Sequence, residues 1–187
     1  VGFRALPDDP AIPFETGQLG EKDFALSYDI RRFVATHDEF ATPELVWTTE
    51  LDAGLEPERA EWRQEFLDPL TASVRAPDFA DPGRSWLISP ELDVGTQADF
   101  IVEFKARHSF EGHTGEHFDG GVIELSRDGG ASWEDIEPLA KMDPDYGGVL
   151  SDCCDNPLGG RRAFVGRSEG WPDEFVTHRL DFGRRLA

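Results

Sequence analysis

The sequence lacks long hydrophobic runs and has almost no cysteine. No stretch approaches the roughly 18 consecutive apolar residues that a membrane helix needs, so we expect a soluble chain that is not inserted in a membrane. The two cysteines are neighbours, so a disulfide between them would staple no long loop. A basic segment followed by an apolar one is also missing after Val1, so we expect a mature or excised piece whose export signal has been removed.

Basic residues are scarce relative to acidic ones. The chain has 18 Lys and Arg against 38 Asp and Glu, which gives a formal net charge of −20. An electrostatic field of that sign repels nucleic-acid phosphates and anionic lipids, so neither is expected as a partner. The field favours cations instead, although a strongly acidic surface also serves simply to keep a protein in solution.

Cys153 and Cys154 make up the whole cysteine content. A trans peptide would hold their Cα atoms about 3.8 Å apart, below the usual disulfide window of about 4.4–6.8 Å, so a vicinal bridge would be strained. The alternatives are two free thiols in a loop, or a bond from one of them to another chain segment. Four ligands at zinc spacing are absent, which disfavours a zinc site. An oxidising compartment would favour the vicinal disulfide.

Residues 118–133 give the clearest local prediction. An apolar β-rich run at 122–125 is followed by Asp-Gly-Gly at 128–130, which tolerates the positive φ angles of a tight turn. Trp133 then resumes an apolar strand and is expected to lie in the core. The segment therefore predicts a β-hairpin with one face inward and the other in water.

Two longer segments show the alternation of half-buried strands. In 98–107 the predicted core face carries Phe100, Val102, Phe104 and Ala106, and the solvated face carries Glu103, Lys105 and Arg107. In 174–182 the expected buried set is Val176, Leu180 and Phe182, with His178 as the exception on that face. Shorter strand patterns lie at 14–17, 24–30, 45–49, 85–90 and 162–166.

Prolines and charges mark the segments that are not strands. Residues 1–13 contain three prolines and are predicted to be an extended N-terminal arm. A charged stretch at 57–67 predicts one short helix, with Pro57 in its first turn and Pro69 beyond its end. Short strands with many Gly and Pro turns otherwise indicate an all-β protein, an antiparallel β-sandwich spanning 14–187.

Six phrases in order along the chain resemble the jelly-roll module, related to MAM domains, of bacterial secreted metallopeptidases of the immune inhibitor A type and of other exported proteins. These phrases lie at 14–17, 87–92, 104–111, 118–121, 128–133 and 156–164. The resemblance implies a jelly-roll sandwich that is secreted as one part of a larger exported polypeptide. Residues 51–70 are longer and more charged than in such modules, which predicts an insertion. In the family pattern a further strand follows the equivalent of Leu180. If that strand is absent here, one edge of the sheet is left unpaired and could pair with a strand from another chain.

The same resemblance implies a structural calcium site at Glu15, Glu111 and Asp119. Calcium takes about six to eight oxygen ligands, which the acidic loops of a sandwich can supply. Plain surface acidity is the alternative for each of the three residues. A bound ion would tie the first strand to the hairpin at 118–133.

Trp62 and Trp171 are the candidate ligand-binding residues. Exposed indoles on sandwich modules stack on sugar faces, so these two residues point to polysaccharide as one class of partner. Trp62 lies on the charged segment and Trp171 in a turn between Gly170 and Pro172. Trp86 lies within a strand pattern and is expected in the core.

The sequence favours a non-catalytic secreted binding or accessory module, for adhesion, substrate or carbohydrate recognition, or scaffolding. Neither His-Glu-x-x-His nor Gly-x-Ser-x-Gly occurs. A secreted hydrolase is the alternative, using acidic pairs as a glycosidase or a metal site in the loop that carries His108, His113 and His117 with Glu111 and Glu116. A self-assembling surface component, joined through the open sheet edge, is the third candidate.

Overall fold

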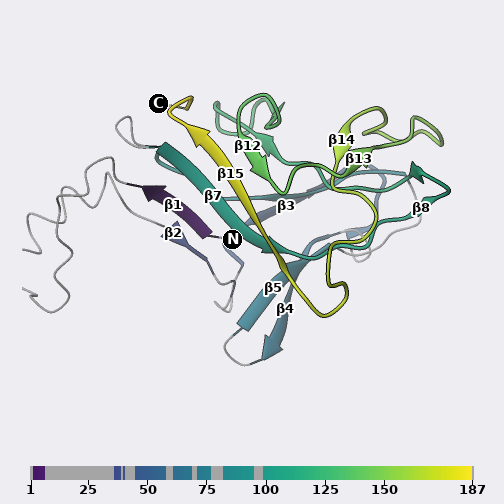
Figure 1. Ribbon diagram of the computed structural model, residues 1–187, viewed down its shortest axis with the longest axis horizontal. Coiled ribbons are helices and arrows are strands. Elements are labelled where there is room, and N and C mark those ends of the chain that lie inside the picture. The colour runs from purple at the N-terminus through teal and green to yellow at the C-terminus, as the bar shows by residue number, and fades with distance from the viewer. Residues whose placement is uncertain are drawn as a thin grey trace, which may run out of the picture.

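The structure is a computed structural model that describes residues 2–6, 36–38, 40, 45–57, 61–68, 71–76, 82–94 and 99–186 (Figure 1). Within these residues the chain is all-β, and its strands run from β1 (Gly2–Leu6) to β15 (Val176–Gly183). The described part holds no helix that is both long and apolar enough to cross a bilayer. The strands expected at 14–17 and 24–30 lie outside the described residues.

The longest strands build a five-stranded antiparallel sheet. Its order is β12 (Lys141–Asp143), β15, β7 (Asp99–Ala106), β1 and β2 (Thr36–His37). β15 and β7 pair from Val176↔Ala106 to Asp181↔Ile101, and a bulge follows before Gly183. Both strands alternate in side-chain character, so each has one mainly apolar face, which on β15 also carries His178. Residues 2–6, expected within an extended arm, pair with β7 as β1.

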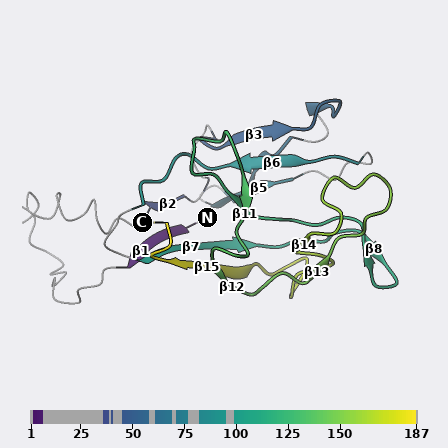
Figure 2. The same ribbon diagram turned by 90° about the horizontal axis from the view of Figure 1, so that it is seen from above.

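Five two-stranded sheets complete the described part. They pair β3 (Thr48–Leu51) with β6 (Ser85–Ile88), β4 (Arg63–Asp68) with β5 (Thr71–Arg75), β8 (Gly112–His113) with β9 (Glu116–His117), β10 (Glu124–Leu125) with β11 (Glu134–Asp135), and β13 (Gly148–Val149) with β14 (Arg162–Ala163). Figure 2 shows β3 and β6 in a layer alongside that of β7, β1 and β15. None of the described sheets closes on itself. The strand expected at 45–49 begins later, at Thr48.

The helix predicted at 57–67 is wrong over residues 63–67. Residues 63–68 form β4 instead, and its register with β5 runs from Arg63↔Arg75 to Asp68↔Thr71 (Figure 1). The β-branched residues of β5 provide a partner for hairpin pairing, and this pairing overrides the modest helix propensity of the charged residues. Burial alternates accordingly, because Trp62 and Gln64 are half-buried while Arg63 is exposed.

The hairpin predicted at 118–133 is confirmed, but its tryptophan is not in the core. Glu124 of β10 lies opposite Asp135 of β11, and Gly129 and Gly130 adopt φ angles of 70° and 88° in the connection. Trp133 is 39% exposed. It is the last residue before β11, and its ring lies near Gly130 at the turn, so it does not join the inward face of a strand.

The core lies on the face that the alternation predicted. Its buried cluster consists of Val102, Ile136, Ala140, Leu180 and Phe182, against which Phe100 and Phe104 pack. Two buried residues were not expected. Ile101 is 1% exposed although it shares the face of β7 with Glu103 and Lys105. His178 is 3% exposed, so its position in the alternation of β15 prevails over its polarity.

Candidate functional site

Three surface regions carry the residues that the sequence singled out: the rim around β8 and β9, the turn before Trp133, and the loop around Trp171. At the rim, Thr114 and Gly115 have φ angles of 53° and 89° and make the tight turn between the two strands. The backbone N–H groups of Phe118 and Asp119 both donate to the carbonyl oxygen of Glu111, at 3.1 and 3.3 Å. The main chains of two predicted calcium residues are therefore joined.

The loop at 151–160 is tied to this rim. The side-chain amide of Asn156 donates to the carbonyl oxygen of Phe118 at 2.8 Å, and the Ser151 N–H donates to the carbonyl oxygen of His117 at 2.8 Å. Figure 1 places β8 and this loop at the same end of the molecule. The rim thus gathers acidic residues from segments that are far apart in the sequence.

The described residues fit a calcium ion only in part. Glu111 and Asp119 are both exposed, and Glu15 lies outside the described residues. The described part contains no group of three or more His, Cys, Asp or Glu that could hold a metal ion. The two carboxylates would therefore need further oxygen ligands from elsewhere, since calcium takes about six to eight.

The three histidines of this region do not converge. His113 pairs with Glu116 and His117 pairs with Gly112 across the hairpin, so the alternation of the strands places the two imidazoles on opposite faces. His108 lies at the other end of the segment, where its ring stacks on Phe110 with centroids 5.0 Å apart. The arrangement gives no support to a metal enzyme built on these residues.

Cys153 and Cys154 are two free thiols, the first half-buried and the second exposed. A hydrogen bond with Cys153 raises the pKa of the Cys154 thiol, and the Asp155 and Glu116 carboxylates add to this effect. Cys154 is therefore protonated at neutral pH and a weak nucleophile.

The loop at 168–175, which we call the Trp171 loop, is held to the body of the protein. Ser168 exchanges hydrogen bonds with the main chain of His108, since its N–H donates at 3.0 Å and its hydroxyl oxygen accepts the His108 N–H at 3.1 Å. Arg107 donates to the carbonyl oxygen of Pro172 at 2.5 Å and lies 4.5 Å from the centroid of the Phe175 ring. Despite these anchors Trp171 is 39% exposed, as a candidate ligand-binding residue should be.

Three carboxylates surround Trp171 in the sequence. Glu169, Asp173 and Glu174 are all exposed, and none forms an ion pair within the described part of the chain. The side chain of Glu174 folds back over Gly170, so that its Oε2 would lie 2.8 Å from a Cβ atom at that glycine. The Trp171 loop thus presents an indole together with carboxylates that have no internal cation.

The turn before Trp133 uses its acidic residue differently. The Asp128 carboxylate accepts the Ser132 N–H at 2.9 Å and the hydroxyls of Ser132 and Ser126 at 2.6 and 2.8 Å. These hydrogen bonds, above all that of the Ser132 hydroxyl, lower the pKa of Asp128 to about 2. The carboxylate therefore holds the turn and is saturated with internal donors.

Trp62, the other candidate ligand-binding residue, is half-buried directly before β4. Its indole nitrogen is buried and has no hydrogen-bond partner in the described part. The polar edge of the ring is therefore turned inward, whereas stacking on a sugar needs an open ring face. Trp86 is also half-buried, beneath the guanidinium of Arg84 at 4.8 Å.

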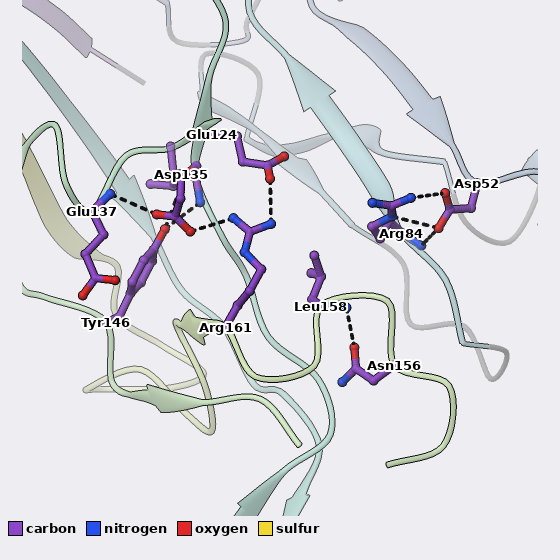
Figure 3. A network of polar contacts seen from close by, with 10 residues as sticks. Asp52, Arg84, Glu124, Asp135, Glu137, Tyr146, Asn156, Leu158 and Arg161 are labelled. Carbon is purple, nitrogen blue, oxygen red and sulfur yellow. Dashed lines mark hydrogen bonds and ion pairs between the residues drawn. The ribbon is translucent and has the colours of Figure 1, made fainter. Parts of the chain in front are cut away.

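A polar network that no sequence motif predicts joins residues from several strands and loops. Arg161 bridges Glu124 and Asp135, with nitrogen–oxygen distances of 2.6 Å to each, and Arg84 pairs with Asp52 at 3.0 Å (Figure 3). Its members come from positions up to 109 residues apart, from Asp52 to Arg161, and show no local spacing. Because Arg161 engages both Glu124 and Asp135, this acidic pair is part of an ion-pair network and offers no free acid for glycosidase chemistry.

Comparisons with protein-family models, with curated proteins and with solved structures find no match for this chain.

Proposed function

We propose that this chain is a non-catalytic binding module of an exported protein, folded as a jelly-roll sandwich, and that it contacts its partner through the Trp171 loop. The layered all-β architecture supports the sandwich part of this proposal. The observation that carries the binding part is a large apolar side chain left exposed on a loop that several contacts hold in place.

The anchoring of the loop favours binding for an entropic reason. Ordering a flexible loop on association costs free energy, and that cost falls when the loop is already held in the free protein. Arg107 and Ser168 supply this order before any partner arrives. Tryptophan is in turn the residue that contributes most per side chain at interfaces, because it removes a large apolar area from water while keeping one hydrogen-bond donor.

The rim supplies a structural role within the same proposal. Glu111 and Asp119, with Glu15, would hold a calcium ion that ties the start of the sandwich to the β8–β9 hairpin. The hydrogen bond from Asp119 to the Glu111 carbonyl oxygen supports it by bringing the two main chains together. The ion would act on stability, since a ligand that binds only the folded state stabilises it.

A paired substitution tests the binding role. A polysaccharide panel and a peptide panel are probed with the intact chain, with Trp171→Ala and with Trp133→Ala. Both tryptophans are 39% exposed, so the variants remove similar surface from different loops. We expect the ligands retained by the intact chain to be lost with Trp171→Ala and kept with Trp133→Ala. Equal retention by both variants would contradict the proposed role of the Trp171 loop.

Thermal melting tests the calcium site separately. Excess calcium should raise the melting temperature and EDTA should lower it, with Glu111→Gln removing most of the difference. At a calcium concentration of 100 times Kd the expected stabilisation is about 2.7 kcal/mol. Glu116→Gln, which neutralises an exposed carboxylate on the same hairpin, is the matched control. Superimposed curves with calcium and with EDTA would refute the site.

A further inference from the structure

We propose that the Trp171 loop recognises a cationic side chain, so that its partner is a protein or peptide segment bearing lysine or arginine. This inference rests on the proposed binding function and specifies the chemistry of the partner. Trp171 would receive the cation on its ring face, and Glu169, Asp173 and Glu174 would flank it.

The charge of the loop selects the partner. Residues 168–175 include three carboxylates and no Lys, Arg or His. All three carboxylates lie within three positions of Trp171, all are exposed, and none forms an ion pair in the described part of the chain. An anionic partner would be repelled here, and a neutral one would leave three charges uncompensated at the edge of the contact.

The local geometry places the Glu174 side chain beside Gly170, the residue before Trp171. Gly170 adopts a φ of 69°, a conformation that favours glycine, and the N–H groups of Asp173 and Glu174 both donate to its carbonyl oxygen, at 2.9 and 3.0 Å. The Glu174 side chain occupies the space that a Cβ at Gly170 would need. This packing holds one carboxylate next to the residue that precedes Trp171.

A cation over an aromatic ring already occurs beside this loop. The Arg107 guanidinium lies 4.5 Å from the Phe175 ring centroid and donates to the carbonyl oxygen of Pro172. Arg107 is thus engaged with a ring and a main-chain carbonyl and does not pair with the three carboxylates. Tryptophan binds cations more strongly than phenylalanine does, so Trp171 is the better of the two rings and the more exposed.

The field of the whole chain acts in the same direction. With a net charge of −20, the protein attracts cationic segments and speeds their encounter. The net charge alone does not determine where on the surface a cation binds. The surroundings of Trp133 show the difference, although its ring is equally exposed. There, Asp128 accepts hydrogen bonds from serines and Glu134 pairs with Arg127 at 3.0 Å. Of these two tryptophan sites, the Trp171 loop is the one that combines an exposed indole with carboxylates that form no ion pair in the described part.

The test uses fluorescein-labelled hexalysine as the probe, with hexaarginine, fully N-acetylated hexalysine and hexaglutamate for comparison. Binding to the intact chain is followed by fluorescence anisotropy at 50 and 150 mM salt. Hexalysine and hexaarginine should bind, and acetylated hexalysine and hexaglutamate should not. Trp171→Ala should weaken hexalysine binding about two- to fivefold, as expected for an exposed cation–π contact. Trp133→Ala should leave it unchanged.

A charge-matched pair of variants separates recognition from general attraction. The loop variant combines Glu169→Gln, Asp173→Asn and Glu174→Gln. The control variant combines Glu116→Gln, Asp152→Asn and Asp155→Asn, which removes the same charge from exposed residues of the rim. The loop variant should weaken hexalysine binding about tenfold, from the loss of three flanking charges, and the control variant much less.

The outcomes distinguish this inference from the function beneath it. Equal weakening by the loop and control variants would mean that the probe senses net charge alone, which overturns the inference. Loss of polysaccharide binding with Trp171→Ala, without any effect on hexalysine, would overturn it as well while keeping the binding function. If Trp171→Ala changes the binding of no ligand in any panel, both the inference and the function fail.

Discussion

The packed face of β7 and β15 changes character along its length. At one end Val102 lies among Leu180, Phe182 and Ile136 in a cluster without a polar side chain. At the other end Phe104 stacks on His178, with ring centroids 4.9 Å apart and an angle of 9° between the rings. We call these the apolar half and the imidazole half. They belong to the same pair of strands and share one face.

The imidazole half is closed around His178. Phe164 meets its ring edge-on at 4.8 Å, and neither ring nitrogen has a hydrogen-bond partner in the described part. Burial lowers the pKa of His178, and the nearby His108, itself shifted downward by burial, adds to the effect. One half of the core therefore depends on neutral imidazoles, whereas the other contains nothing that titrates. The two halves are similarly buried, but only the stability of the imidazole half is expected to fall at acidic pH.

The largest expected effect comes from the apolar half. Leu180 is 2% exposed at the centre of the cluster, so Leu180→Ala should lower the free energy of unfolding by about 2–5 kcal/mol through lost burial and the cavity left behind. Because no titratable side chain lies in the cluster, the loss should be the same at pH 7.5 and pH 5.5. Urea unfolding at the two pH values measures it. Val149→Ala, at a residue 52% exposed, is the control and should change little. A loss below about 1 kcal/mol would mean that this cluster is not a close-packed core.

The imidazole half should make stability depend on pH. The folded-state pKa of His178 lies below its unfolded value of about 6.5, so the unfolded chain binds the proton more readily. Its contribution is thus present above pH 6.5 and is lost as the pH falls below that value, by up to about 1.4 kcal/mol per pH unit for each such histidine. Phe104 and Phe164 contact its ring, and the charge of His108 lowers its pKa further.

His178→Phe isolates this effect. A phenyl ring keeps the stack on Phe104 and the edge contact with Phe164 while removing the proton site. Urea unfolding between pH 7.5 and 5 should show a shallower decline than in the unchanged chain, with a remainder due to His108. His113→Gln, at an exposed imidazole on β8, should keep the full decline. If His178→Phe declines as steeply as the unchanged chain, buried His178 is not the source of acid sensitivity.

The comparison also explains what the sequence could predict. The apolar half follows from alternation alone, because Phe100, Val102 and Phe104 repeat every second residue and so share a face. His178 sits in the same alternation, but a polar residue type argues for exposure, and only the contacts from Phe104 and Phe164 show which tendency prevails.

The features of the candidate sites also differ in whether the local sequence could predict them. The exposed turn at Trp171 is a local property, because its flanking glycine and proline are adjacent in sequence. The failures needed longer-range information: β4 forms because β5 pairs with it, and Arg161 meets Glu124 and Asp135 across stretches of 37 and 26 residues. The prediction that Trp133 lies in the core failed because β11 begins one residue later, at Glu134. Trp133 therefore ends the turn, and a shift of one residue changes the face on which a side chain lies.

The smallest expected effect lies where the two halves meet. Tyr146 is 4% exposed; its hydroxyl oxygen accepts the Ile123 N–H at 2.8 Å, and its ring meets the Phe164 ring edge-on at 4.9 Å. Ile123 packs against the apolar cluster, so Tyr146 contacts both halves. Burial raises the pKa of its hydroxyl far above neutrality, which keeps this contact independent of pH in the range of the histidine effect.

Tyr146→Phe keeps the ring and removes the hydroxyl, which accepts the Ile123 N–H at 2.8 Å and donates to the Ile123 carbonyl oxygen at a long 3.5 Å. It should lower the free energy of unfolding by about 1 kcal/mol, the net worth of one hydrogen bond, because the half-buried Ile123 can recruit a water for its N–H. Urea unfolding gives the total, and amide exchange at Ile123 should speed up because its N–H has lost a protein acceptor. The pH slope should stay as in the unchanged chain, since the imidazole half keeps its Phe164 contact. A variant that altered the slope would show that the halves are coupled through this hydroxyl, and the boundary between them would then have to be drawn elsewhere.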